Sequence, residues 1–552
     1  MSRRTFMQGA VVLAAAGVII KALGAVFKIP LGNMIGDTGM GYYQTAYTIY
    51  VMFLVLSNSG IPVAISRMVS ERIAVGRPWD AHRVFRVSFI LLLLIGLVSS
   101  SLCFFKTDLV LHHFPNMENS SYSVKAIAPA LLIVPIMAAY RGYFQGKQNM
   151  RPTANSQVLE QFFRVAAGIG AAWYMLPRGE QFAAAGAAFG AAAGAAAGLL
   201  TVVVIYALSG GNRGARHAEE KAKARGGSAR TPESVQGILL RICLIAVPIT
   251  IGASIMPIMN FIDLAIITNR LSDLGWAAEE IRKTYGQLAG LVNPLINLPQ
   301  ILTQAVAMSL VPAVAAAHKR GDDAFLRHNI SLGLRTAIII GLPCALGMMT
   351  LSKQIMLLLY PAVKEAAISA APFLFILGFG IIFLSTVQTL TGVLQGIGRQ
   401  MIPVRNLCVG AAAKIAVTWT LMAIPAINVK GAAIGTVTAY VLAAALNLMA
   451  VRRHTGTRFD IGLTYVKPAL AAIAMSAAVL AVYGALHALT GRAAIPTVVA
   501  IAAGAAVYAS MLFFGGAITE EELLLLPGGK RLAKPLRALR KRKNQYFFRR
   551  KH

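Results

Sequence analysis

Long apolar segments separated by short polar ones run along almost the whole chain. Each of about fourteen segments is close to the roughly 20 residues with which a helix crosses a bilayer. This pattern predicts an all-α polytopic membrane protein with about fourteen transmembrane helices. The predicted spans are residues 6–31, 41–69, 86–106, 123–146, 153–177, 182–209, 237–269, 287–316, 328–352, 366–397, 402–425, 429–451, 464–489 and 494–516.

Basic residues collect in every second predicted loop. Most of the 52 Lys and Arg residues lie in these loops and in the two chain ends. The positive-inside rule therefore predicts that both termini are cytoplasmic. Some cations lie within apolar segments instead, where holding a charge costs a few kcal/mol, so each is a candidate functional residue. These cations are Lys21, Lys28, Arg67, Arg164 and Lys414.

The composition excludes a soluble protein. The chain has 552 residues, of which 57% are hydrophobic and 13% charged. A net charge of +31 would indicate nucleic-acid binding in a soluble chain. Here it follows from the basic loops and a basic tail suited to anionic lipid headgroups, so we expect no nucleic-acid partner. The four cysteines and nine histidines lack metal-binding spacing, and we expect no metal site.

The first apolar segment admits two interpretations. Ser2-Arg3-Arg4 resembles the start of a twin-arginine export signal. The apolar run, however, continues past Lys21 to about residue 31, and further spans follow. We therefore interpret it as the first transmembrane helix.

Residues 210–236 divide the chain into two similar parts. This segment is rich in Gly, Ala, Arg and Lys, which predicts a flexible cytoplasmic linker. Motifs recur across it, since Gln145-Gly146 matches Gln395-Gly396 and residues 63–66 match 306–309. The predicted substrate site of such a repeat lies between the lobes, near the bilayer midplane. The predicted parts are two six-helix lobes (1–209 and 237–452), two further helices (453–516) and a basic cytoplasmic tail (517–552).

Lys21 and Lys28 are seven residues apart and therefore lie on one helix face, about 10 Å apart along the axis. Two ammonium groups on an inward face would bind a diphosphate. Alternatively, Lys28 lies near the helix end and extends to the outer headgroups.

Two oppositely charged pairs have the i, i+4 spacing that lets side chains meet on a helix. Glu160 and Arg164 form either a structural ion pair in the fifth helix or a substrate contact. Arg67 and Glu71, at the cytoplasmic end of the second helix, form either a gate-closing pair or a solvated helix end.

Lys414 and Asp263 lack a neighbour of opposite charge within their predicted helices. Asp and Glu are absent from about 402 to 451, so Lys414 either contacts the other lobe or faces water. Asp263 lies well inside the seventh helix, where an acid would couple transport to a proton or cation, or stay neutral in a hydrogen bond.

Two other patterns concern packing and the membrane interface. Glycine recurs every four residues from Gly186 to Gly198, which predicts close approach of another helix. Residues 272–286 carry Trp276 and Tyr285 and predict a short interfacial helix with its aromatic groups at headgroup depth.

The order of these residues resembles a known family. The supporting stretches run from Lys21 through Lys28-Ile-Pro to Gln44, and from Ser59-Gly-Ile-Pro to Glu71. Further stretches are Tyr143-Phe-Gln-Gly146, Ser156 to Arg164, Tyr285-Gly-Gln-Leu, Asn293 to Pro299 and Ala517-Ile-Thr-Glu-Glu. Together they resemble the polysaccharide biosynthesis proteins, and more narrowly the branch that holds the stage V sporulation protein B and the Gram-positive lipid II flippases.

This resemblance implies a two-lobed, V-shaped, alternating-access carrier of the multidrug/oligosaccharidyl-lipid/polysaccharide exporter superfamily. Helices one, two, seven and eight would line a cation-rich cavity, and helices thirteen and fourteen would form a groove for the lipid tail. The murein-precursor flippases have an arginine where Lys21 stands, so a basic role is implied there. They follow it with an Arg-Asp pair, whereas this chain has Phe27-Lys28.

The expected function is that of a flippase, not an enzyme, in the bacterial cytoplasmic membrane. The expected cargo is an undecaprenyl-diphosphate-linked saccharide, lipid II first, carried by a monomer to the outer leaflet for peptidoglycan synthesis. The alternatives are another lipid-linked polysaccharide repeat unit, or multidrug cation antiport, which would need carboxylates in the cavity. No phosphate-binding nucleotide loop occurs in the sequence. We therefore expect no cofactor, and transport driven by the membrane potential or an ion gradient.

Overall fold

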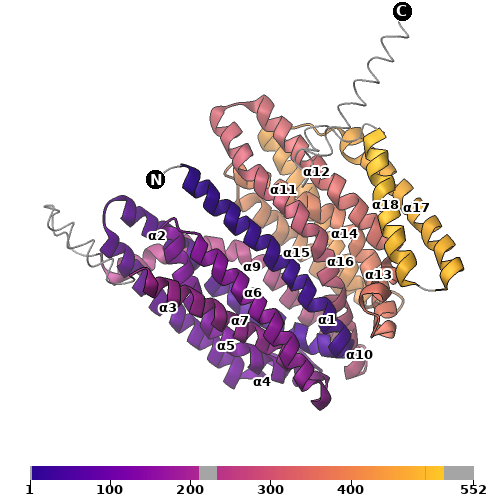
Figure 1. The fold of residues 1–552 in the computed structure, drawn as a ribbon, viewed down its shortest axis with the longest axis horizontal. Coiled ribbons are helices and arrows are strands. Elements are labelled where there is room, and N and C mark those ends of the chain that lie inside the picture. Colours follow the sequence, from indigo (N-terminus) through magenta and orange to yellow (C-terminus); the bar gives the residue numbers. More distant parts are fainter. Residues whose placement is uncertain (1–2, 211–232, 492, 515–552) are drawn as a thin grey trace, which may run out of the picture. The chain divides into compact units, whose positions relative to one another are not determined.

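The computed structural model describes residues 3–210, 233–491 and 493–514 (Figure 1). These residues are helical with short connections and include no strand, which confirms the all-α prediction. Twelve helical stretches among them are long and apolar enough to cross a membrane, so the chain is a multi-pass membrane protein. α6 (Arg151–Met175), which carries Glu160 and Arg164, is not among the twelve. The exact count of fourteen thus stays a prediction, as do the lobe boundaries.

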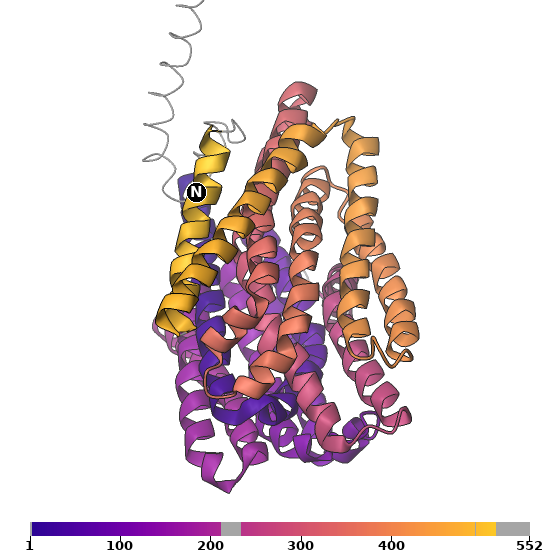
Figure 2. The same cartoon turned by 90° about the vertical axis from the view of Figure 1, so that its right-hand side faces the viewer.

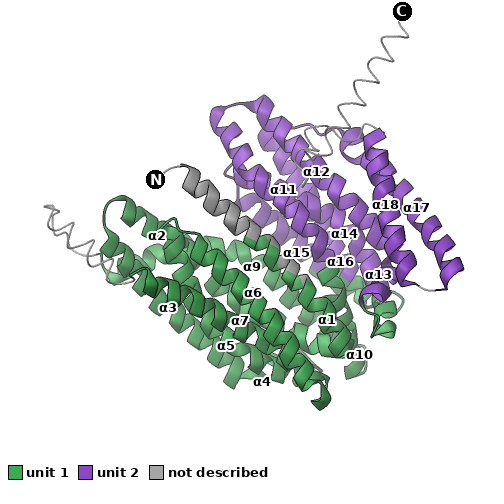
Figure 3. Cartoon of the chain, in the orientation of Figure 1, with its two compact units in different colours: residues 1–295, 360–370, 415–432 green, residues 296–359, 371–414, 433–552 purple. Residues whose placement is uncertain are grey.

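The chain divides into two compact units (Figure 3). Unit 1 comprises residues 1–295, 360–370 and 415–432, and unit 2 comprises 296–359, 371–414 and 433–552. The longer helices before residue 295 are α1 (Arg3–Asn58), α2 (Gly60–Ala74), α3 (Pro78–Phe105), α5 (Ser121–Gly146), α6, α7 (Glu180–Leu208) and α9 (Val235–Asp273). Those that follow are α11 (Asn293–Arg320), α12 (Asp323–Thr350), α14 (Lys364–Gly396), α15 (Met401–Met422), α16 (Lys430–Thr455), α17 (Lys467–Thr490) and α18 (Ala494–Phe514).

Short elements connect these helices. They are α4 (Thr107–Leu111), η1 (Glu118–Ser120), η2 (Leu176–Arg178), α10 (Ala278–Tyr285), η3 (Gly286–Val292), α13 (Ser352–Leu359) and η4 (Gly462–Val466). Most of the predicted linker and the whole predicted basic tail lie outside the described residues.

A kinked helix, not the predicted loop, connects the first two predicted spans. Residues 32–40, expected to be a loop, are helical except for a kink at Gly36, where φ is 67° and ψ is −173°. A positive φ suits glycine because it has no Cβ. The Asp37 carboxylate accepts a hydrogen bond from the Thr38 backbone N–H at 3.0 Å, so the helix restarts directly after the kink. The second predicted helix is also divided, because α1 ends at Asn58 and α2 begins at Gly60.

The glycine stripe of α7 packs against α6, as its four-residue spacing predicted. A Cβ at Gly194 would overlap the Glu160 carbonyl oxygen, and a Cβ at Gly190 would overlap the Arg164 carbonyl oxygen. The stripe therefore allows the α7 backbone to approach the turn of α6 that carries both charged residues.

A second glycine contact recurs in the two units. In unit 1, a Cβ at Gly142 of α5 would lie 2.9 Å from the Pro62 carbonyl oxygen of α2. In unit 2, a Cβ at Gly392 of α14 would lie 2.7 Å from the Ala307 carbonyl oxygen of α11. Gly392 follows Gly142 by the same number of residues as Gln395-Gly396 follows Gln145-Gly146. The recurrence of this contact therefore supports the internal repeat. The sequence match of residues 63–66 with 306–309 pairs Ala64 with Ala307. In this backbone contact, however, Pro62 is the residue that corresponds to Ala307.

Unit 2 has its own apolar core, which includes the last two helices. α17 and α18 lie side by side as an antiparallel pair (Figure 2). Met475 and Val479 of α17 are buried together with Leu334 and Ile338 of α12. The Tyr508 hydroxyl of α18 donates to the Ile339 carbonyl of α12 at 2.9 Å. The pair is thus packed into the unit, while its predicted role as a lipid-tail groove stays a prediction.

The segment predicted to form a short interfacial helix contains α10, Tyr285 at its end is buried, and the depth in the membrane stays a prediction. Tyr285 is only 2% exposed, and its hydroxyl is 3.1 Å from the Thr48 hydroxyl of α1. The side chain packs inward because α10 continues into η3, which is buried throughout.

Candidate functional site

Three charged side chains form a buried cluster between α5 and α6 of unit 1. Glu160 accepts from Arg141 at 2.9 Å through one carboxylate oxygen and from Arg164 at 3.2 Å through the other. The three side chains are between 9% and 15% exposed. Arg141 also donates to the Ser156 hydroxyl at 2.8 Å. We call Arg141, Glu160 and Arg164 the arginine–glutamate cluster. It confirms the predicted Glu160–Arg164 pair and adds a second arginine to it.

A row of tyrosines from α1 borders this cluster. Tyr43, Tyr47 and Tyr50 follow one another along the helix, with ring centroids 5.8 and 5.9 Å apart, and we call them the tyrosine row. The Arg164 guanidinium lies near all three phenols. Its Nε atom is buried without a hydrogen-bond partner in the part of the chain that the structure describes. A buried N–H of this kind is available to an incoming acceptor.

Lys28 contacts the same tyrosine row. It lies in the part of α1 before the kink at Gly36, whereas the tyrosines lie in the part after it. Its Nζ atom lies 5.4 Å from the centre of the Tyr47 ring, a cation–π distance, and donates to Gln44 Oε1 at 3.3 Å. Phe27 packs edge-on against Tyr43 in the same region. The kink at Gly36 thus turns Lys28 back onto Gln44 and Tyr47, which favours the inward-facing alternative of the two predicted for it.

These groups form an electropositive site. Lys28, Arg141 and Arg164 contribute three positive charges, and Glu160 contributes one negative charge. Because the surplus charge is largely buried, a ligand with anionic oxygens would gain from it more than it would in water. The hydroxyls of the tyrosine row add neutral hydrogen-bond donors. The site is therefore suited to holding an anionic group such as a phosphate or diphosphate.

Asp263 lies in α9, outside the arginine–glutamate cluster. It is half-buried in α9 and interacts electrostatically with Tyr285, whose hydroxyl meets Thr48. The Thr48 hydroxyl also accepts from the Gln44 amide at 3.5 Å, and Gln44 accepts from Lys28, so hydrogen bonds lead from Tyr285 to Lys28. The acid is thus not an isolated one, and its predicted role in coupling stays a prediction.

Arg67 and Glu71 form a separate, exposed group. Arg67 donates to Glu71 at 3.0 Å, and Arg241 of α9 donates to the other Glu71 oxygen at 2.7 Å. The Arg67 side chain is 64% exposed and that of Glu71 is 37% exposed. The predicted pair therefore exists, but it ties α2 to α9 and is not part of the tyrosine-row site.

The other two predicted cations lie elsewhere. Lys414 is in α15 of unit 2 and is only 4% exposed, and the choice between its two predicted surroundings stays a prediction. The Lys21 side chain lies outside the described residues, although its backbone belongs to α1.

Sequence reasoning missed Arg141 and the tyrosine row. Arg141 is not among the five embedded cations that were singled out, although it falls within the predicted span 123–146 and carries the same signal. Tyr43, Tyr47 and Tyr50 are spaced by four and three residues, which places them on one helix face. No group of three or more His, Cys, Asp or Glu side chains suited to a metal ion occurs among the described residues.

Comparisons with known proteins agree with this architecture. The uncharacterized membrane protein YabM of Bacillus subtilis (strain 168) is 29% identical over 97% of this chain and 98% of its own length. Stage V sporulation protein B of the same organism is 26% identical over 82% and 85% of the two chains. Its lipid II flippase MurJ is 26% identical over 91% and 94%.

The fold and the family follow from three further matches. A solved structure of the lipid II flippase MurJ in an inward closed conformation superposes with a TM-score of 0.67 at 13% identity, covering 91% of this chain and 98% of that one. Residues 287–420 match the MatE family model. Residues 6–318, more than half of the chain, match the model of the polysaccharide biosynthesis proteins. The chain belongs to the polysaccharide biosynthesis protein family.

Proposed function

We propose that this protein is a flippase for an undecaprenyl-diphosphate-linked saccharide, with lipid II as its first candidate cargo. It would move the headgroup from the inner to the outer leaflet by alternating access, as a monomer in the bacterial cytoplasmic membrane with both termini in the cytoplasm. The relative named as a lipid II flippase supports this class of cargo.

The observation that carries the proposal is the cation surplus at the tyrosine row. Moving a diphosphate into the membrane removes its hydration, which must be replaced by donors and positive charge. Lys28 lies over the Tyr47 ring and the Arg164 guanidinium lies near the same tyrosine row, so both would provide this. The saccharide and the diphosphate would cross within the protein, while the polyprenyl chain stays in lipid.

The alternative transport functions require different charged side chains facing the cargo. A carrier of another lipid-linked repeat unit would use the same diphosphate contacts, so it shares this site. A multidrug cation antiporter would need carboxylates facing its cargo. The buried Glu160 is held by two arginines, and the charge balance of the site therefore favours anionic cargo.

Complementation separates the candidate cargoes. We expect the chain to restore growth to a bacterial strain depleted of its own lipid II flippase, with a strain lacking a polysaccharide repeat-unit flippase as the matched comparison. Rescue of the second strain alone would assign the protein to the other lipid-linked saccharides. Rescue of neither, with the protein present in the membrane, would contradict the proposed function.

Transport should respond to the membrane potential. An inside-negative potential favours outward movement of an anion by about 2.3 kcal/mol per charge per 100 mV. In energised vesicles, dissipating the potential with an ionophore should slow the appearance of labelled lipid-linked saccharide on the outer leaflet. An unchanged rate after collapse of the potential and of both the Na⁺ and proton gradients would rule out this energy source.

A further inference from the structure

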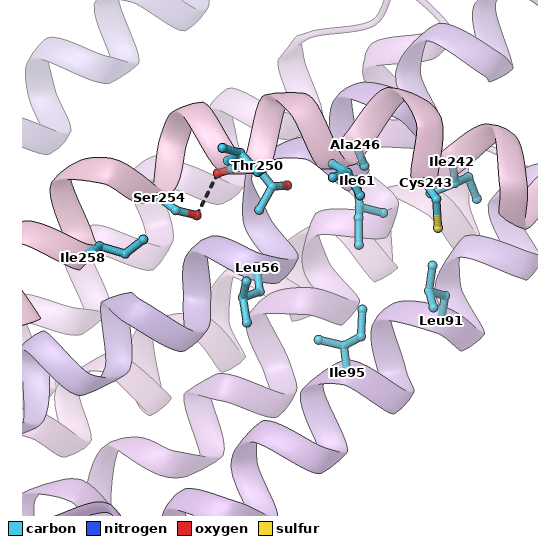
Figure 4. Close-up of a pocket in the computed structure, with 12 residues that line it drawn as sticks. Leu56, Ile61, Leu91, Ile95, Ile242, Cys243, Ala246, Thr250, Ser254 and Ile258 are labelled. Atoms are coloured by element: carbon cyan, nitrogen blue, oxygen red, sulfur yellow. Dashed lines mark hydrogen bonds between the residues drawn. The ribbon is translucent and has the colours of Figure 1, made fainter. Parts of the chain in front are cut away.

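A cavity of about 460 Å³ lies in unit 1, away from the tyrosine-row site. It is bounded by the end of α1, by α2, by α3 and by α9 (Figure 4). Leu56, Leu91 and Ile95 face α9 across it, and Cys243 of α9 faces back. We call this cavity the α3–α9 groove. Its volume falls within the roughly 300–1,000 Å³ of pockets that hold one small ligand.

The groove is apolar, and apolar side chains surround it. The Ser254 hydroxyl donates to the Thr250 carbonyl at 2.7 Å, so this polar group is satisfied within α9. Leu94 of α3 and Leu244 and Ile251 of α9 are 54%, 69% and 57% exposed. An acyl chain in the groove would have these exposed apolar side chains beside it. The α9 residues that line the groove extend over about 24 Å, more than half of the roughly 30 Å hydrocarbon core, which suits a chain lying along the membrane normal.

Close backbone contact fixes one wall of the groove. Gly60 at the start of α2 has no room for a Cβ, which would overlap the Ala246 carbonyl oxygen of α9. α2 and α9 therefore meet directly at this level. The groove lies beside this contact and is a shaped part of the unit.

Two arginines, Arg241 and Arg67, lie at one end of the groove. Arg241 directly precedes the groove residue Ile242, is 48% exposed, and shares Glu71 with Arg67. Two exposed guanidinium groups around one carboxylate leave one surplus positive charge. Arginine at the end of an apolar groove is the arrangement that a lipid phosphate fits, because guanidinium groups match phosphate oxygens.

We propose that the α3–α9 groove binds an anionic phospholipid, with one acyl chain in the cavity and the phosphate at Arg241 and Arg67. The single surplus charge matches the single negative charge of phosphatidylglycerol, whereas a polyprenyl diphosphate carries more. The lipid would belong to the leaflet into which these arginines extend. Bound there, it would brace α9 against α3 and is a component separate from the transported cargo.

Photo-cross-linking tests this assignment. The full chain is reconstituted in phosphatidylcholine vesicles containing a minor fraction of phosphatidylglycerol with a photoreactive diazirine in one acyl chain. We expect cross-links to concentrate on the peptides that carry Leu91, Ile95 and Cys243. Cys243→Trp fills the groove and should reduce their yield severalfold. Leu244→Trp, on the exposed face of the same helix, is the matched control and should leave the yield unchanged.

The headgroup contact is tested separately. In wild-type protein the phosphatidylglycerol probe should outcompete the same probe with a phosphatidylcholine headgroup. Arg241→Gln removes the surplus charge and should reduce this preference about fivefold, the factor that one cation contributes near an anionic lipid surface. Ile95→Trp fills the groove from α3 and provides a second test if Cys243→Trp does not accumulate.

Several outcomes would overturn the proposal. Cross-links spread evenly over the exposed faces of α3 and α9 would mean that the groove holds no specific lipid. Equal yields for the two headgroups in wild-type protein would remove the role of the arginines. Displacement of the probe by a smaller amount of polyprenyl phosphate would assign the groove to an isoprenoid chain.

Discussion

Replacing Glu160 by glutamine is expected to destabilise the protein by about 3–5 kcal/mol, the cost of removing one partner from a buried ion pair. Glu160 holds Arg141 and Arg164 at 2.9 and 3.2 Å, and the substitution keeps the shape but removes the only carboxylate of the cluster. Two buried guanidinium groups would then repel one another. Thermal unfolding of the purified protein in detergent measures the loss.

An exposed pair provides the control for this prediction. Asp323 and Arg327 of α12 have the same i, i+4 spacing as Glu160 and Arg164, but their side chains are 71% and 51% exposed. Asp323→Asn should therefore leave the unfolding temperature almost unchanged. Adding Arg141→Gln to Glu160→Gln should recover part of the loss, because one of the unpaired charges is removed. An unchanged unfolding temperature for Glu160→Gln alone would show that the cluster is not held by charge.

Replacing Lys28 by methionine is expected to lower transport roughly 10- to 100-fold, the effect of losing one hydrogen bond to a charged group. Methionine keeps the apolar stem against Tyr47 and removes the ammonium group. Folding should be preserved, since a buried cation costs free energy. Lys28→Arg should retain part of the activity because it keeps the charge but changes the geometry. The measurement is the rate at which labelled lipid-linked saccharide reaches the outer leaflet of reconstituted vesicles.

Lys147 is the matched control for Lys28. Its Nζ atom lies 5.2 Å from the centre of the Tyr143 ring, almost the same cation–π distance, but at the end of α5 and away from the tyrosine row. Lys147→Met should therefore transport at the wild-type rate. If both variants transport equally well, Lys28 does not contact the cargo.

Most of the helical architecture could be predicted from the sequence, because a bilayer imposes a strong local constraint. Every backbone group in hydrocarbon must be satisfied within its segment, so apolar runs of sufficient length become helices. The glycine stripe from Gly186 to Gly198 likewise predicted close helix packing, since the missing side chains are visible in the sequence itself. The helix boundaries near Gly36 and Ser59 were wrong, because a kink and a continuous helix have the same hydropathy.

The candidate site could be predicted only in part. Charge inside an apolar span identified Lys28 and Arg164, and i, i+4 spacing identified the pairing of Glu160 with Arg164. The same spacing also identified Arg67 and Glu71, which are exposed and lie outside the site. Spacing along a helix shows which side chains meet, but it does not show whether the face they share is buried.

By itself, the sequence determined the class of protein, the helices and the surplus of embedded cations, because these depend on composition and on contacts within one helix. Only the tertiary structure decided which cations share a site. The kink at Gly36 folds Lys28 onto Tyr47, and packing of α5 and α6 brings Arg141 to Glu160 across 19 residues. Contacts of this kind depend on the directions of whole helices, and no local pattern along the chain encodes them.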